Sequence, residues 1–188
     1  IHGRARSDFF SGKADWGVIA EVKARARIPV VGNGDVFAPE DAGRMFRETG
    51  VDGVMLGRGV MSNPWLIRQC WDYLTTGRAT AVGLEERMEF MSAFLARVCA
   101  EVPPPVALGK IKKVGGTLSR GFPGGAQLRG KMHAARTTAE FFDALAGHFA
   151  GLRGAGLDQA FAPPAPAENG GHPDADDVEH DHRGRPPE

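Results

Sequence analysis

Two stretches of this chain decide its fold: Ile28-Pro-Val-Val-Gly-Asn-Gly-Asp35 and Asp52-Gly-Val-Met-Leu-Gly-Arg-Gly59. Each is a short apolar run that ends in a polar loop containing glycine, and a helical pattern follows each one. Two such units in tandem are typical of successive βα repeats in a parallel-sheet protein. In a βα barrel the loops after the strands face the active site, and the last two strands commonly share a phosphate site with the N-terminus of a short extra helix.

Capping residues and hydrophobic periodicity predict the elements around these stretches. Pro39 and Gly50 mark the start and the end of the helix between the two strands. Asn63 is expected to cap the short extra helix, with Pro64 at its first helical position. Gly115-Gly116 is expected to interrupt a later helix. The predicted strands are residues 28–31 and 53–56, and the other predicted helices are residues 15–25, 64–76, 84–101, 107–119, 126–135 and 137–149.

The beginning of the chain also indicates its organisation. It opens on Ile1 rather than Met, Ile1-His2-Gly3-Arg4 has the character of a strand end, and the first residues do not show the charged-then-apolar pattern of a signal peptide. A complete βα barrel needs roughly 250 residues, so we expect the C-terminal portion of a longer protein. The predicted fold is α/β: the C-terminal part of a (β/α)8 TIM barrel in residues 1–79, a small all-α helical domain in residues 80–152, and a disordered, Pro/Gly-rich acidic tail in residues 153–188.

The formal net charge of zero conceals a strong asymmetry, because residues 102–139 contain no Asp or Glu. A basic segment of this length favours an anionic partner, for which RNA is the natural candidate, over an ordinary solvated helix face. Cys70 and Cys99 lie far apart in helical patterns, which favours reduced thiols in a cytoplasmic protein without a metal site. The protein is expected to be a monomer. The residues predicted to contact RNA are Lys112, Lys113, Arg120 and Arg129.

The loops after the strands carry the candidate ligand-binding residues. Gly34 and Gly57 would let the backbone approach a ligand closely, and Arg58 adds a positive charge, so together they predict an anion site. The alternative is that these glycines only serve tight turns. The cofactor-binding set predicted at this rim is His2, Asn33, Gly34, Asp35, Gly57 and Arg58, whereas Arg6 is expected to be a simple loop charge.

These motifs together resemble the second half of bacterial tRNA-dihydrouridine synthases. The resemblance is dense over residues 1–66 and looser in the helical region, where Leu128-Arg129 and Thr137-Thr-Ala-Glu140 carry it. Lys110-Ile-Lys-Lys113 departs from the basic Arg-Lys-His segment of the commonest bacterial pattern. The motifs of the dense part are His2-Gly-Arg4, Gly12-x-Ala-Asp-Trp16, Ile28–Asp35, Thr49-Gly-Val-Asp-Gly-Val-Met-Leu-Gly-Arg58 and Asn63-Pro-Trp65.

The resemblance implies a flavin-dependent oxidoreductase with FMN as cofactor, NADPH as electron donor and a uridine of tRNA as substrate. It implies that Asn33, Gly34 and Asp35 hold the ribityl-phosphate side of FMN, that Gly57 and Arg58 bind its phosphate, and that His2 contacts the flavin. The family's catalytic cysteine belongs to the half that is absent here, so no catalytic residue is assigned and we expect the chain alone to be inactive. The alternatives are another FMN barrel oxidoreductase, which would need no basic helical domain, or a truncated RNA-binding module.

Overall fold

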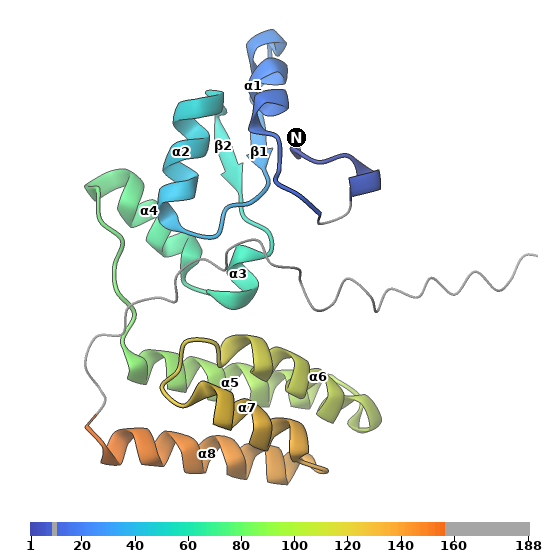
Figure 1. Cartoon of the computed structure of the whole chain (residues 1–188), viewed down its shortest axis with the longest axis vertical. Helices are drawn as coiled ribbons and strands as arrows, with labels where there is room; N and C mark the ends of the chain where they lie inside the picture. The colour runs from blue at the N-terminus through green and yellow to red at the C-terminus, as the bar shows by residue number, and fades with distance from the viewer. Residues whose placement is uncertain (9–10, 157–188) are drawn as a thin grey trace, which may run out of the picture.

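A computed structural model of the chain describes residues 1–8 and 11–156. These residues form an α/β unit and a helical unit, one above the other along the long axis of the molecule (Figure 1). The α/β unit contains the 3₁₀ turn η1 (Arg6–Asp8), the helices α1 (Trp16–Arg25), α2 (Pro39–Thr49), α3 (Gly59–Ser62) and α4 (Leu66–Thr76), and the strands β1 (Val31–Asn33) and β2 (Gly53–Met55). The helical unit contains α5 (Leu84–Glu101), α6 (Pro104–Leu118), α7 (Gly125–Ala134) and α8 (Thr138–Gly154).

The two strands are parallel and are joined through α2, as the predicted βα units require. The N-terminal residues continue this pattern on the other side of β1, because the Asn33 N–H donates to the Ile1 carbonyl at 2.8 Å and His2 forms a parallel bridge with Asn33. The α/β class predicted from the sequence is therefore confirmed in this region.

The first strand begins at Val31, three residues later than the sequence predicted. Two features of the preceding residues explain the shift. Pro29 has no N–H to donate to a strand ladder, and the N–H of Val30 donates to a carboxylate oxygen of Asp52 at 2.6 Å instead. Pairing with β2 then runs from Val31 opposite Gly53 to Asn33 opposite Met55.

A small core holds the α/β unit together. The side chains of Ile19, Met45 and Leu66, from α1, α2 and α4, are fully buried in one cluster. Because α2 lies between the strands in the chain and packs in this cluster, the core fixes where the strand ends and their loops lie. Val31 and Met55 point to the other face of the sheet and remain about half exposed, at 49% and 59%.

The short extra helix lies one loop earlier than predicted. It is α3, which starts immediately after Arg58, and Asn63 follows its last residue rather than capping a new helix. The Asn63 side chain donates to the Gln69 side chain at 2.7 Å, and α4 begins only at Leu66. The Asn-Pro pair thus lies between two helices. The helix predicted over residues 64–76 is present as α4, which starts two residues later, but the prediction that Asn63 caps it was wrong.

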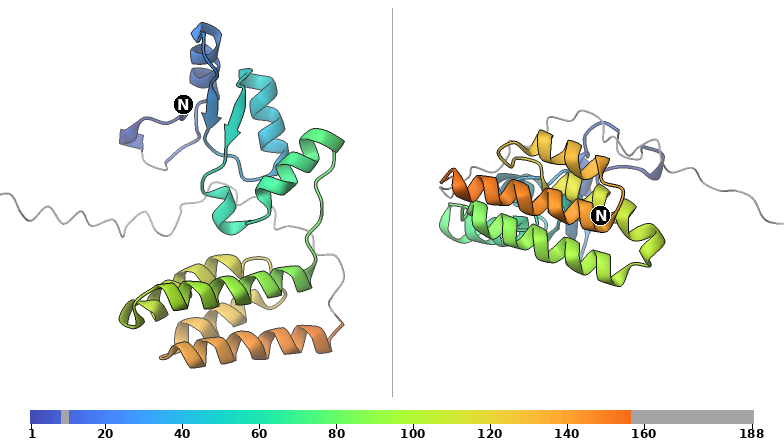
Figure 2. Two further views of the ribbon diagram at one scale, coloured as in Figure 1. Left: turned by 180° about the vertical axis from the view of Figure 1, so that it is seen from behind. Right: turned by 90° about the horizontal axis from the view of Figure 1, so that it is seen from below.

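The helical unit has a separate hydrophobic core, to which all four helices contribute. Figure 2 shows these helices lying alongside one another below the α/β unit. Gly115 does not interrupt α6, contrary to the prediction, because the helix runs without a break from Pro104 to Leu118. A Cβ atom at Gly115 would lie 2.9 Å from Cζ of the buried Phe141 ring, so the glycine allows α6 to approach α8.

Thr137 caps α8, since its hydroxyl accepts a hydrogen bond from the Glu140 N–H at 3.1 Å. The reciprocal bond of a capping box is displaced by one residue, because Glu140 accepts from the N–H of Arg136 rather than of Thr137. The helix extends to Gly154, five residues beyond its predicted end. Most of the predicted tail, residues 157–188, lies outside the described residues.

The two units meet through a few side chains near the start of α4. The rings of Trp65 and Phe90 lie 5.0 Å apart, and Arg68 pairs with Glu86 across the junction at 3.3 Å. These contacts place the loop after β2 and the helix α3 next to α6.

Candidate functional site

The structure brings the six predicted cofactor-binding residues together at the ends of the strands. Arg58 contacts Asp35 at 3.0 Å, and His2 pairs with Asn33 on the neighbouring segment. A Cβ atom at Gly57 would lie 3.9 Å from the Asn33 side chain, and one at Gly34 would lie 3.6 Å from the His2 ring. Residues from three separate parts of the chain therefore form one cluster.

Gly34 and Asp35 form the turn that leaves β1, and both have positive φ, at 133° and 52°. A side chain at Gly34 would be strained by this backbone conformation and would meet the Cβ atom of Ala14 at 2.7 Å. The Trp16 indole N–H donates to the Gly34 carbonyl at 2.9 Å and holds the turn from the other side. The glycine thus permits a close approach between the strand end and residues 14–16.

Asp35 is the centre of the cluster, and its carboxylate accepts four hydrogen bonds. Arg4 donates to both oxygens at 2.8 Å, the Ala14 N–H donates at 2.7 Å and Arg58 donates at 3.0 Å. Burial alone would raise the pKa of Asp35. The hydrogen bonds from Arg4 and Ala14 and the charges of both arginines outweigh that effect and lower the pKa below its ordinary value of 3.8. Asp35 is therefore a bridge between two cations.

Arg4 was not among the residues predicted for this site. Its side chain is 3% exposed, and besides Asp35 it donates to the carbonyls of Ser11 and Gly12, at 3.0 and 2.6 Å. The only signal in the sequence was its position beside His2. That signal could not reveal a partner 31 residues away.

Two of the predicted ligand-binding side chains also have partners within the protein. The amide of Asn33 donates to the Met55 carbonyl at 2.7 Å and so links the ends of β1 and β2. The Nδ1 atom of His2 accepts a hydrogen bond from the Arg4 N–H at 2.9 Å. These bonds orient both side chains at the rim, and their contact with a flavin stays a prediction.

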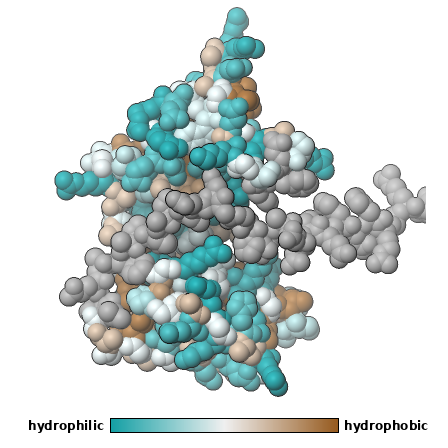
Figure 3. All heavy atoms as spheres, in the orientation of Figure 1, coloured by the Kyte–Doolittle hydropathy of each residue, from teal (hydrophilic) through white to brown (hydrophobic). Residues whose placement is uncertain are grey.

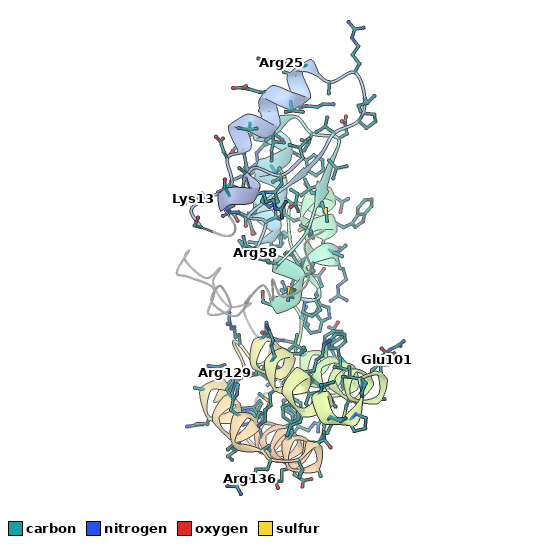
Figure 4. The ribbon with its side chains drawn as sticks, turned by 90° about the vertical axis from the view of Figure 1, so that its right-hand side faces the viewer. Lys13, Arg25, Arg58, Glu101, Arg129 and Arg136 are labelled. Atoms are coloured by element: carbon teal, nitrogen blue, oxygen red, sulfur yellow. The ribbon has the colours of Figure 1, made fainter. Side chains whose placement is uncertain are left out.

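The residues predicted to contact RNA lie on α6, α7 and the loop between them, and the structure gives them different surroundings. Lys112 donates to the His133 carbonyl at 2.8 Å, whereas Lys113 and Arg120 are exposed and Arg129 is half-buried. The face of the helical unit shown in Figure 3 carries hydrophilic residues interspersed with hydrophobic ones. In Figure 4 the labels of Arg58 and Arg129 lie on the same side of the molecule, at the facing ends of the two units.

A buried arginine supports the loop that carries Arg120. Arg87 on α5 is 7% exposed, donates to the Arg120 carbonyl at 3.0 Å and lies over the Phe122 ring, 4.9 Å from its centroid. The His148 ring contacts the Pro123 carbonyl at 2.9 Å at the other end of this loop. Arg87 was not singled out from the sequence, because a charged residue inside an amphipathic helix is usually solvated.

Neither cysteine belongs to the cluster at the strand ends. Cys70 is buried in α4, where burial raises the pKa of its thiol to about 11, and Cys99 lies in α5. Among residues 1–8 and 11–156 there is no group of His, Cys, Asp and Glu side chains suited to hold a metal ion. Within the same part of the chain, no helix combines the length and apolar character required for a membrane span.

Comparison with known proteins assigns most of this chain to one family. The family model described as dihydrouridine synthase (Dus) matches residues 1–150, which include the strand-end cluster and nearly all of the helical unit. The chain belongs to the dihydrouridine synthase family.

Individual relatives of this Dus chain agree with the assignment. A Rickettsia conorii protein named "Probable tRNA-dihydrouridine synthase" is 35% identical over 134 residues, which cover 71% of this chain and 40% of the relative. An Aquifex aeolicus protein of the same name is 38% identical, over 69% of this chain and 40% of the relative. The Xanthomonas campestris protein named "tRNA-dihydrouridine synthase B" is 32% identical, over 77% of this chain and 46% of the relative. The chain therefore spans less than half the length of these relatives.

Proposed function

We propose that this Dus chain contributes the flavin-phosphate site and the tRNA-binding domain to an FMN-dependent, cytoplasmic tRNA-dihydrouridine synthase. The observation that carries the proposal is the cluster of Gly34, Asp35, Gly57 and Arg58 at the ends of adjacent parallel strands, in a chain whose family match covers residues 1–150. Ligand sites of parallel-sheet proteins lie at this edge of the sheet.

The chemistry of the cluster fits the phosphate end of FMN. Phosphate requires a positive site, and the carboxylate of Asp35 is outnumbered by the guanidinium groups of Arg4 and Arg58. Gly57 is exposed and has no side chain to obstruct a ligand beside Arg58. We expect Arg58 and the Gly57 backbone to hold the phosphate, Asn33 and Gly34 to contact the ribityl side, and His2 to contact the flavin.

The bound FMN would supply redox chemistry, by which reducing equivalents from NADPH would reach C6 of a uridine in tRNA as a hydride, and a proton added at C5 would complete 5,6-dihydrouridine. The residues of this chain would bind and orient the cofactor and the tRNA. The resemblance assigns protonation of C5 to a cysteine, and we give that role to neither Cys70 nor Cys99. Cys70 is buried in the core of the α/β unit with a raised thiol pKa, and Cys99 belongs to the helical unit.

Recognition of tRNA is proposed for the surface around the α6–α7 loop. Folded RNA is held largely through its shape and phosphates, and a segment without acidic residues from 102 to 139 suits such a ligand. Arg120 is exposed on a loop whose carbonyl groups are held by Arg87 and His148, so its position is well defined. We expect Lys112, Lys113 and Arg129 to contribute to the same surface.

Two binding measurements on the chain test the proposal. FMN should bind more tightly than riboflavin, which lacks the phosphate, when binding is followed by flavin fluorescence. Fluorescent tRNA should bind with an affinity that falls as salt rises, with a slope of about 0.7 to 0.9 per phosphate contact. The double variant Arg120→Ala/Arg129→Ala should lower both affinity and slope, whereas Arg97→Ala, an exposed arginine of α5 outside the acid-free segment, should change neither.

The same measurements separate the alternatives. Binding of FMN without binding of tRNA would favour another FMN barrel oxidoreductase. Binding of tRNA by a chain that never binds FMN, even when joined to its upstream residues, would favour an RNA-binding module.

A further inference from the structure

We propose that Arg4 is a positioning residue that acts through Asp35 to keep Arg58 effective as an anion-binding group. The inference rests on the proposed phosphate site and adds to it a residue that does not touch the ligand. Its basis is the arrangement of three charged side chains on different segments: a buried guanidinium, a bridging carboxylate and a more exposed guanidinium.

Burial increases steadily from Arg58 to Arg4. The side chain of Arg58 is 26% exposed, that of Asp35 is 15% exposed and that of Arg4 is 3% exposed. An incoming anion therefore reaches Arg58 first, and Arg4 lies behind the carboxylate. This order favours an effect of Arg4 through Asp35 over a direct contact with the anion.

The geometry of the two ion pairs also indicates that Asp35 interacts more strongly with Arg4 than with Arg58. Arg4 forms a two-pronged pair, with one nitrogen 2.8 Å from each oxygen of Asp35, whereas Arg58 reaches a single oxygen at 3.0 Å. Two-pronged pairs of this kind are the stronger and the more directional. Asp35 is thus compensated mainly by Arg4, and the three groups together retain one positive charge.

Loss of Arg4 would reverse this balance. Asp35 would then have Arg58 as its one arginine partner, the net charge of the remaining pair would be zero, and an anion would have to compete with the carboxylate for Arg58. The carbonyls of Ser11 and Gly12, which accept hydrogen bonds from Arg4, would also lose their link to the site. Both consequences weaken binding of the phosphate, while contacts to a flavin ring are not directly affected.

The experiment compares Arg4→Gln with Arg6→Gln, an exposed arginine two residues away whose removal changes the total charge equally. The readout is the ratio of the riboflavin and FMN dissociation constants, which isolates the contribution of the phosphate. We expect Arg4→Gln to reduce this ratio about tenfold or more, the scale of one hydrogen bond between charged groups, and Arg6→Gln to leave it unchanged. Arg4→Lys should recover part of it, because the charge returns without the two-pronged geometry.

The double variant Arg4→Gln/Asp35→Asn separates charge balance from a merely structural role. It restores the single positive charge on Arg58 and should regain much of the ratio that Arg4→Gln loses. If Arg4 only supported the fold, a second change at a bonded partner would leave binding as weak or weaker. Far-UV circular dichroism of each variant establishes that it is folded before binding is compared.

Titration with inorganic phosphate, followed by the backbone NMR signals of Gly57 and Arg58, keeps the inference testable without a flavin. A wild-type chain that prefers FMN, together with an Arg4→Gln variant that matches Arg6→Gln, would overturn the role of Arg4 and leave the proposed function standing. A wild-type chain without preference for FMN would overturn the proposed cofactor. In that case the inference survives if phosphate binds and Arg4→Gln abolishes the binding, and it falls if phosphate does not bind.

Discussion

Replacement of Gly115 by alanine tests the close packing of α6 on α8. In an open helical position this change stabilises a protein by about 1 kcal/mol, because alanine has the higher helix propensity. At Gly115 the new Cβ atom would meet Phe141 Cζ at 2.9 Å and Met132 Sδ at 3.3 Å. Both side chains are fully buried, and added volume in a packed core costs about 1 to 3 kcal/mol. We expect Gly115→Ala to lower the free energy of unfolding by up to about 2 kcal/mol.

The matched control is Gly109→Ala in the same helix, where an added Cβ atom would have no neighbour within 4 Å. This variant should be more stable than the wild type, so the two alanine variants should differ by about 1 to 3 kcal/mol. Urea unfolding followed by far-UV circular dichroism measures the difference as a shift of roughly 1 M in the midpoint. A Gly115→Ala midpoint at or above that of Gly109→Ala would refute the packing described here.

Three further predictions concern a helix cap, a carboxylate and a thiol. Thr137→Ala should lower the unfolding free energy by about 1 kcal/mol through loss of the α8 cap, whereas Thr138→Ala should lower it by less. Urea unfolding measures the unfolding free energy of both variants. Because the folded-state pKa of Asp35 lies below 3.8, its ionised form stabilises the fold fully above that value and the contribution disappears as the pH falls through the lowered pKa. Chemical unfolding between about pH 5 and pH 3 should therefore show a flatter stability profile for Asp35→Asn than for the wild type. With a pKa of about 11, Cys70 should react slowly with a disulfide reagent at neutral pH, so Cys99→Ser should remove the fast phase and leave a thiol that reacts readily only after unfolding.

Local patterns predicted most of the elements, because the signals that define them are short. Gly50 ends α2 in the left-handed conformation, and Asp15 caps α1 through hydrogen bonds to the N–H groups of Gly17 and Val18. The errors arose where a distant residue decides the outcome. The Val30 N–H donates to the Asp52 carboxylate and not to a strand partner. The Phe141 ring leaves no room for a side chain at Gly115 in the middle of α6.

The candidate site was predicted in part for the same reason. The positions of Gly34, Asp35 and Arg58 at strand ends follow from the βα pattern, and the structure brings them together. The bridging geometry of Asp35 does not follow from that pattern, because it depends on Arg4 and on the Ala14 N–H, which lie more than twenty residues earlier in the chain. A carboxylate in a motif can equally contact a ligand or orient another residue, and only the tertiary contacts distinguish these roles.

The same charge cluster couples ligand binding to stability. A buried charge that loses its partner is strongly destabilising, whereas removal of both members of a pair costs much less. Arg4→Gln leaves Asp35 with a weaker set of partners, and Asp35→Asn leaves the 3% exposed guanidinium of Arg4 without its carboxylate. The double variant Arg4→Gln/Asp35→Asn leaves neither of these two charged groups without its partner. It should therefore unfold at a higher urea concentration than Asp35→Asn, and it should bind phosphate better than Arg4→Gln. Since the gain in stability and the gain in binding arise from one change in charge balance, their appearance together in the double variant would identify the cluster as a single electrostatic unit.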